Sequence, residues 1–141
     1  MARYFGIDEA NERLADVAPL LEQLKADRDR VAELQPEIDR AQKTNGSAEH
    51  AEELARNQNE LRAAVRRMQQ AVLQIDQWGV TLRDINTGLI DFPALVMGRP
   101  IWLCWRLGEG DAINWWHEAT KGFDSRMPLA ELDMGGLGGR A

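Results

Sequence analysis

The sequence predicts an α+β fold, in which a long antiparallel helical hairpin is followed by a small antiparallel β module of three or four strands. This prediction rests on a change in the spacing of apolar residues along the chain. Apolar residues recur in alternating steps of three and four along the first half, as in a coiled coil, and in steps of two beyond residue 80. All five tryptophans lie in the second region or at its edge. We expect one folded unit: a hairpin over 1–79, a tryptophan-rich module packed on it over 80–129, and a flexible glycine-rich tail over 130–141.

The first helix is predicted to start at Gly6, with Glu9 in the capping-box position. Pro19 and Pro36 lie off its apolar seam, so we expect them to bend the helix rather than end it. Seven of the nine seam positions are apolar. The predicted seam consists of Ala10, Leu14, Val17, Leu21, Leu24, Arg28, Val31, Gln35 and Ile38.

The second helix is predicted to be capped by Ser47 and to end after Trp78, where Gly79 follows. Leu20 and Leu73 lie beside the two seams and form a second apolar stripe that needs a cover. Either the β module folds over this stripe or a second copy packs there, and we favour a homodimer for its distal part. The second predicted seam consists of Ala51, Leu54, Gln58, Leu61, Val65, Met68, Val72 and Ile75.

Strand-like alternation follows the hairpin, interrupted by turn residues. Large aromatic side chains compensate for the small aliphatic core that so short a module can bury. An antiparallel meander fits this pattern. The predicted strands cover residues 80–85, 89–92, 101–107 and 112–117.

The composition excludes several classes of protein. A net charge of −6 disfavours a nucleic-acid partner, because phosphate binding needs a basic patch. No apolar stretch approaches the roughly 20 residues that cross a bilayer, and the N-terminus has no apolar core of a secretion signal. Cys104 is the only cysteine, so no internal disulfide can form. We expect a cytoplasmic protein without a membrane or nucleic-acid partner.

Three stretches of the β module, together with the opening of the first helix, resemble a known family. They are residues 88–94 (GLIDFPA), 103–109 (LCWRLGE) and 116–118 (WHE) followed by Gly122-Phe123, with Tyr4-Phe5 and residues 9–11 near the start. In this order they resemble small bacterial proteins catalogued as domain of unknown function 2203, over about residues 4–129. The family has no established activity, so the resemblance implies a fold and no chemistry.

His117 is the most suggestive residue for chemistry, because it ends a predicted strand beside Glu118. If residues 108–111 form a four-residue loop, Cys104 and His117 become diagonal neighbours on one face of the sheet. A loop longer by one residue would reverse this arrangement. In the first register, the thiolate, the imidazole and a carboxylate from Asp91 or Glu118 could bind a transition metal such as zinc or iron.

A structural interpretation of the same residues stays open. His117 could bond a backbone carbonyl or Asp91, while Cys104 packs as a small hydrophobe. The sequence has no close ligand pair such as Cys-x-x-Cys, so we expect no bound cofactor. A cysteine nucleophile is disfavoured, because burial in a strand raises the pKa of a thiol.

Two further sets of residues each have a structural alternative. Trp102, Trp115 and Arg106 could line a pocket for a small aromatic or anionic ligand, although stacking of arginine on indole is also ordinary packing. His50 lies in the first turn of the second helix among glutamates and is expected to be a solvated surface residue.

These patterns favour a non-catalytic interaction or scaffold protein that associates through its hairpin, with itself or with a protein partner. The alternative is a metal-binding protein, or a metalloenzyme, with its site around His117. The sequence alone leaves both interpretations open.

Overall fold

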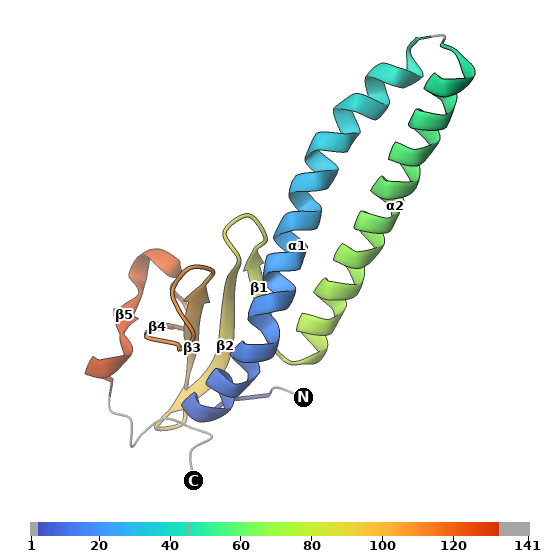
Figure 1. Ribbon diagram of the computed structural model, residues 1–141. Helices are drawn as coiled ribbons and strands as arrows, with labels where there is room; N and C mark the ends of the chain where they lie inside the picture. The colour runs from blue at the N-terminus through green and yellow to red at the C-terminus, as the bar shows by residue number, and fades with distance from the viewer. Residues whose placement is uncertain (1–2, 45, 133–141) are drawn as a thin grey trace.

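A long helical hairpin stands beside a five-stranded antiparallel sheet (Figure 1). The computed structural model describes residues 3–44 and 46–132. Helix α1 spans Ile7–Gln42 and helix α2 spans Ala48–Gln77. The strands follow in sheet order: β1 (Thr81–Asp84), β2 (Leu89–Val96), β3 (Arg99–Arg106), β4 (Trp115–Glu118) and β5 (Met127–Pro128). The predicted α+β class is confirmed, with one strand more than expected.

The helix ends lie where the sequence places them. Gly6 is the N-cap of α1, the Ser47 hydroxyl accepts a hydrogen bond from the His50 backbone N–H at the start of α2, and Gly79 follows α2 with a φ of 82°. Pro19 and Pro36 both lie inside α1. Each removes one helical hydrogen bond without ending the helix, as predicted.

The predicted seams are wrong at Arg28 and Gln35 of α1 and at Val65 and Val72 of α2. In α1 the buried positions pass from Leu24 to Asp27 and Leu34, so Arg28 and Gln35 are exposed. Two successive three-residue steps, at 21, 24 and 27, shift the seam by one position, as a stammer does in a coiled coil. In α2 the buried residues are Ala64, Ala71 and Ile75, so the predicted Val65 and Val72 lie outside the seam.

An ion pair between a buried aspartate and a half-exposed arginine accompanies this shift. Asp27 is 4% exposed, and its carboxylate accepts hydrogen bonds from Arg67 of α2 at 2.9 and 3.2 Å and from Gln23 at 3.1 Å. The Arg67 hydrogen bonds hold the pKa of Asp27 below its usual range. A charged residue at a seam position breaks the apolar pattern, which explains why the pattern alone misplaces the seam here.

Strand β2 is longer than predicted and runs through Pro93 to Val96. A proline fits here because β1 pairs with β2 only from Leu89 to Asp91, so beyond Asp91 that edge of β2 is free of a ladder. The Pro93 carbonyl instead accepts a hydrogen bond from the Phe5 N–H at 2.7 Å. Met97 and Gly98, with φ of 50° and 80°, then form the tight turn to β3 where the sequence predicts a longer loop.

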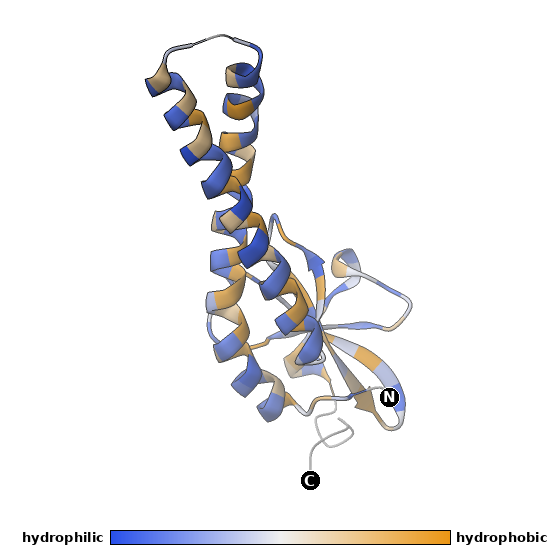
Figure 2. Ribbon diagram, turned by 90° about the vertical axis from the view of Figure 1, so that its right-hand side faces the viewer, coloured by the Kyte–Doolittle hydropathy of each residue, from blue (hydrophilic) through white to orange (hydrophobic). Residues whose placement is uncertain are grey.

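Alternation along the strands gives the sheet two different faces. One face packs on the first half of α1 and carries large apolar residues such as Phe92, Leu103 and Trp116. The other face, which carries Asp91, Cys104 and His117, points away from the hairpin. Beyond Leu24, α1 contacts chiefly α2, and the hairpin projects past the sheet (Figures 1 and 2).

The chain remains ordered past the expected end of the module. Leu129–Glu131 forms a short 3-10 helix, and Leu129 is buried in the core. The rest of the predicted flexible tail, from residue 133, lies outside the described residues. Within the described ranges, neither long helix is apolar enough to cross a membrane.

Candidate functional site

Three neighbouring strands bring Asp91, Cys104 and His117 together on the face of the sheet that points away from the helices. In the β2–β3 ladder Asp91 lies directly opposite Cys104. In the β3–β4 ladder Cys104 pairs with Trp115 and Trp102 pairs with His117, so Cys104 and His117 are diagonal neighbours. This is the register that follows from a four-residue loop over 108–111.

The cluster is fully buried. The exposed fractions of Asp91, Cys104 and His117 are 2%, 1% and 1%. One donor atom from each residue, a carboxylate oxygen, the sulfur and a ring nitrogen, lies within 4.8 Å of the others. No other such group of three occurs among the described residues.

Both ring nitrogens of His117 face oxygen atoms. Nδ1 lies 2.9 Å from the Glu118 backbone carbonyl oxygen, and Nε2 lies 3.0 Å from Asp91 Oδ2. The carbonyl oxygen is only an acceptor, so Nδ1 carries a proton and donates it. A neutral imidazole then presents a lone pair at Nε2 toward a carboxylate oxygen. Either a second proton or a cation must lie between these two atoms.

Only one of the two carboxylate oxygens of Asp91 has a hydrogen-bond partner among the described residues. Its Oδ2 accepts a hydrogen bond from Arg83 Nε at 2.8 Å, and the Arg83 guanidinium lies over the Trp102 ring at 4.7 Å. Its Oδ1 is buried and has no hydrogen-bond partner in the described part of the chain. An orphaned carboxylate oxygen is costly to bury, so it marks a place where a further ligand would be stabilising.

The Cys104 thiol is protonated at neutral pH. Burial, and then the negative charge of Asp91, raise its pKa to about 12. Arg126 opposes this shift only weakly, because its Nη1 lies 3.9 Å from the sulfur while the same guanidinium binds Glu109 at 3.0 and 2.8 Å. The metal-free thiol is therefore a poor nucleophile, as the sequence predicts.

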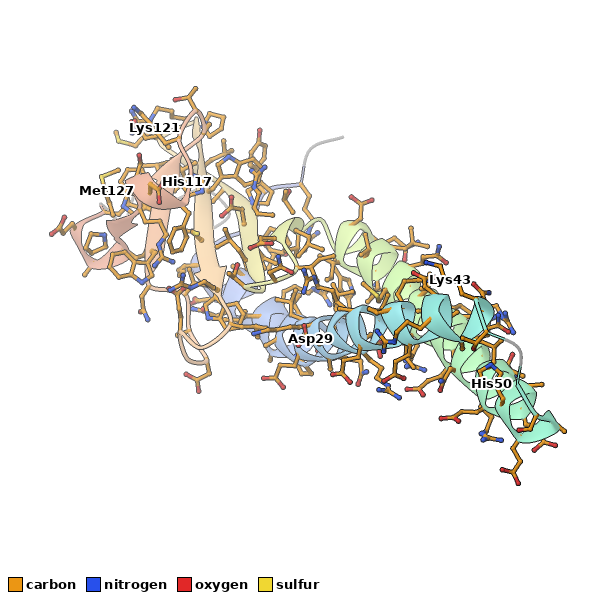
Figure 3. The ribbon with its side chains drawn as sticks, turned by 90° about the horizontal axis from the view of Figure 1, so that it is seen from above. Asp29, Lys43, His50, His117, Lys121 and Met127 are labelled. Atoms are coloured by element: carbon orange, nitrogen blue, oxygen red, sulfur yellow. The ribbon has the colours of Figure 1, made fainter. Side chains whose placement is uncertain are left out.

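A cavity of about 310 Å³ opens over the cluster. Asp91, Cys104 and His117 line it, Leu89 and Phe123 provide apolar wall, and residues 119–122 form part of its rim. Arg83 and Lys121 are the cations that line it. Lys121 lies near His117 at the sheet end of the molecule, whereas His50 lies at the tip of the hairpin (Figure 3).

Three sets of predicted residues lie differently from the arrangement expected of them. The Glu118 side chain alternates to the opposite face from His117 and lies 3.8 Å from Arg99, so only its carbonyl contacts the cluster. His50 is not simply solvated, because its Nε2 lies 3.1 Å from the Ala41 carbonyl oxygen and ties the two helices together.

The predicted pocket of Trp102, Trp115 and Arg106 is the third. Trp102 lies under Arg83, apart from the other two residues. Trp115 and Arg106 lie at the ends of one stack, in which Arg126 lies over both Trp115 and Phe123 and Arg106 lies over Phe123. They share the outer face with the cluster but pack against its surroundings. Arg106 therefore stacks on an aromatic ring, which is the alternative to a ligand pocket given above.

Sequence reasoning missed Arg83, Lys121 and Arg126 as neighbours of the cluster. Arg83 lies in a β-bulge, because Leu82 pairs with Ile90 and Asp84 with Leu89. This irregularity places Arg83 beside Asp91, and strand alternation alone does not report it. The segment carrying Lys121 and Arg126 is irregular, and no periodic signal reports which way it folds.

Comparison with known proteins gives a family and no activity. No curated protein and no solved structure matches the chain. The model of the family described as uncharacterized conserved protein, domain of unknown function 2203, matches residues 3–129, which include both helices, all five strands and the whole cluster. The chain therefore belongs to the domain of unknown function 2203 family.

Proposed function

We propose that this protein binds one transition-metal ion through Asp91, Cys104 and His117. The observation that carries the proposal is the buried triad of an oxygen, a sulfur and a nitrogen donor, all within 4.8 Å of one another. A cation bound to His117 Nε2 and to Asp91 also removes the conflict between two facing lone pairs.

The donor set favours zinc or iron. Thiolate and imidazole are the ligands these ions prefer, and a carboxylate completes a site of three protein ligands. Donor atoms in a tetrahedral zinc site lie about 3.3 to 3.8 Å apart, and the three donor atoms of the triad, which lie within 4.8 Å of one another, would need at most a small approach to hold such an ion. Binding releases the thiol proton, because the thiolate is the ligand.

The surroundings of His117 resemble those of a metal ligand. A ligating histidine usually donates its second ring N–H to a carbonyl or carboxylate, which fixes the ring orientation. The Glu118 carbonyl oxygen receives His117 Nδ1–H in this way at 2.9 Å. Arg83 similarly holds the Asp91 carboxylate from behind.

The site leaves one coordination position toward the cavity. Structural zinc sites are normally closed by four protein ligands, whereas catalytic sites have three and keep a position for water or substrate. With three ligands beneath a 310 Å³ cavity, the arrangement fits the second kind. A metal bound there could polarise a ligand or activate a water molecule.

The test is metal analysis of untagged protein by mass spectrometry. We expect about one equivalent of metal in the wild type, and none in His117→Ala or Cys104→Ser. His50→Ala is the matched control, because it removes the other histidine at the far end of the molecule and should retain the metal. Folded wild type that neither contains metal nor takes up added zinc or iron would refute the proposal, and His117 would then be a structural residue.

We propose a second function, self-association through the hairpin, on a separate observation. Val65, Val72 and Leu73 are 37%, 40% and 57% exposed, although such residues are normally buried. With Val31 and Met68 they line an apolar groove of about 630 Å³ along the hairpin.

A second copy fits this groove by symmetry. A twofold pairing brings the same groove from both chains together, so each copy supplies the Leu73 side chain that the other needs as cover. Sedimentation equilibrium should show a dimer that dissociates in Leu73→Asp. Gln70→Asp introduces the same charge on an exposed residue of the same helix outside the groove lining, and it should stay dimeric. A monomeric wild type at high micromolar concentration would exclude this function.

A further inference from the structure

We propose that the cavity over the Asp91–Cys104–His117 cluster binds a small oxyanion, a carboxylate or phosphate group, held by Lys121 and Arg83. One part of this inference rests on the proposed metal site, namely that the anion would also occupy the open coordination position of the metal. The charge of the cavity supports it independently.

Asp91 is the single acidic residue of the cavity lining, and its carboxylate already has partners there. Its Oδ2 lies 2.8 Å from Arg83 Nε and 3.0 Å from His117 Nε2. The floor of the cavity therefore holds its one carboxylate among a cation and an imidazole.

The remaining charged residues of the cavity lining are both cations. Arg83 and Lys121 outnumber Asp91, the single acidic residue of the lining, so the cavity has an excess of basic residues. The whole chain carries −6. A cavity of the opposite sign to its protein, with low-dielectric walls such as Leu89 and Phe123, concentrates anions.

Arg83 is placed in advance for such a ligand. Its Nε bonds Asp91 at 2.8 Å, and its guanidinium plane is stacked on Trp102 at 4.7 Å, so the side chain is fixed. Its terminal nitrogens have no hydrogen-bond partner among the described residues. The guanidinium edge of Arg83 and the exposed ammonium group of Lys121 together suit a compact oxyanion.

The size of the cavity limits the ligand. A volume of about 310 Å³ corresponds to roughly ten water molecules at about 30 Å³ each. A phosphate or carboxylate with a few further heavy atoms fits, and the apolar wall at Leu89 and Phe123 suits a short hydrocarbon portion beside the anionic group.

The experiment is a titration of the full chain with inorganic phosphate and, separately, with acetate, at constant ionic strength. Backbone amide signals of residues 119–123 are followed by NMR, once with a chelator present and once with zinc added. We expect saturable shifts in this segment. Lys121→Gln should raise the dissociation constant about tenfold, because one charged hydrogen bond is lost. Lys25→Gln, an exposed lysine of α1 remote from the cavity, should leave it unchanged.

The outcomes separate the two proposals. Saturable binding in chelator with no metal uptake would sustain the anion site and refute the metal site. Metal uptake without saturable shifts for either anion would refute the anion site alone. Equal weakening in Lys121→Gln and Lys25→Gln would also overturn it, because binding would then reflect general surface charge. The stronger of the two titrations identifies the ligand as phosphate-like or carboxylate-like.

Discussion

Alternate residues of the same strands bury very different chemistry on the two faces of the sheet. The face toward α1 holds Phe92 and Leu103, which are fully buried among apolar neighbours. The opposite face holds Asp91, Cys104 and His117, which are equally buried but polar or ionisable.

The two faces of the sheet therefore differ in how burial affects the stability of the fold. Apolar burial on the inner face stabilises the fold by about 25 cal/mol for each Å² removed from water. Burial of a carboxylate and an imidazole costs free energy unless every polar atom is paired, and Asp91 Oδ1 is not. We therefore expect the outer cluster to stabilise the fold less than the inner core does, which makes that cluster the place to look for a function.

The largest effect that tests this contrast is expected at Phe92. Phe92→Ala should lower the free energy of unfolding by about 3 to 5 kcal/mol, because it leaves a cavity in the inner core. Its chain neighbour Asp91 is the control on the other face, and Asp91→Asn should cost less than about 1.5 kcal/mol. Urea denaturation measures both. Equal losses would mean that the outer cluster supports the fold as strongly as the core does.

Metal binding should raise the stability of the outer face in a second test. A ligand at one hundred times its dissociation constant stabilises the native state by about 2.7 kcal/mol. Zinc should therefore raise the melting temperature of the wild type, and a chelator should reverse the rise. His117→Ala should melt at the same temperature with and without zinc. An equal rise in His117→Ala would place the metal elsewhere.

The distinction between the two faces was predictable, and its cause is simple. Strand alternation has a fixed period, so the register across the connection between β3 and β4, residues 107–114, sets the relation of Cys104 to His117. Asp91 joins them because β2 pairs with β3 across a tight turn. Local rules of pairing offered this arrangement as one of two registers, and the structure has the register in which Cys104 and His117 share a face.

Other parts of the fold and site were not predictable from local rules. The one-position shift of the α1 seam depends on Asp27. Its carboxylate can be buried because it pairs with Arg67, which lies forty residues further along the chain. The continuation of β2 through Pro93 depends on the Phe5 N–H, which takes the place of a ladder partner. Lys121 lies over the cluster because an irregular segment folds back. Each depends on a tertiary contact that no sequence period reports.

Cys104 makes a smaller, pH-dependent contribution. Burial, and then the charge of Asp91, raise its pKa from 9.0 to about 12. A raised pKa in the folded state stabilises the fold fully below about pH 9, and this stability is lost as the pH rises toward 12. The metal-free wild type should lose about 1 kcal/mol by pH 10, a loss that Cys104→Ala should lack. Urea denaturation from pH 7 to pH 10 checks this, and parallel profiles for the two proteins would contradict it.

The smallest effect on folding is expected on the hairpin. The outer face of the sheet buries polar residues, whereas one face of the hairpin exposes apolar residues. Val72 is 40% exposed beside Ala71, which is 4% exposed in the seam. Val72→Ser should change the unfolding free energy of the monomer by less than about 0.5 kcal/mol, because little apolar contact is lost. The same change should weaken the dimer, since Val72 lines the groove. Dilution series by light scattering, with urea denaturation at low concentration, separate the two effects. A clear loss of monomer stability without any change in association would assign Val72 to the core and leave the groove without a role.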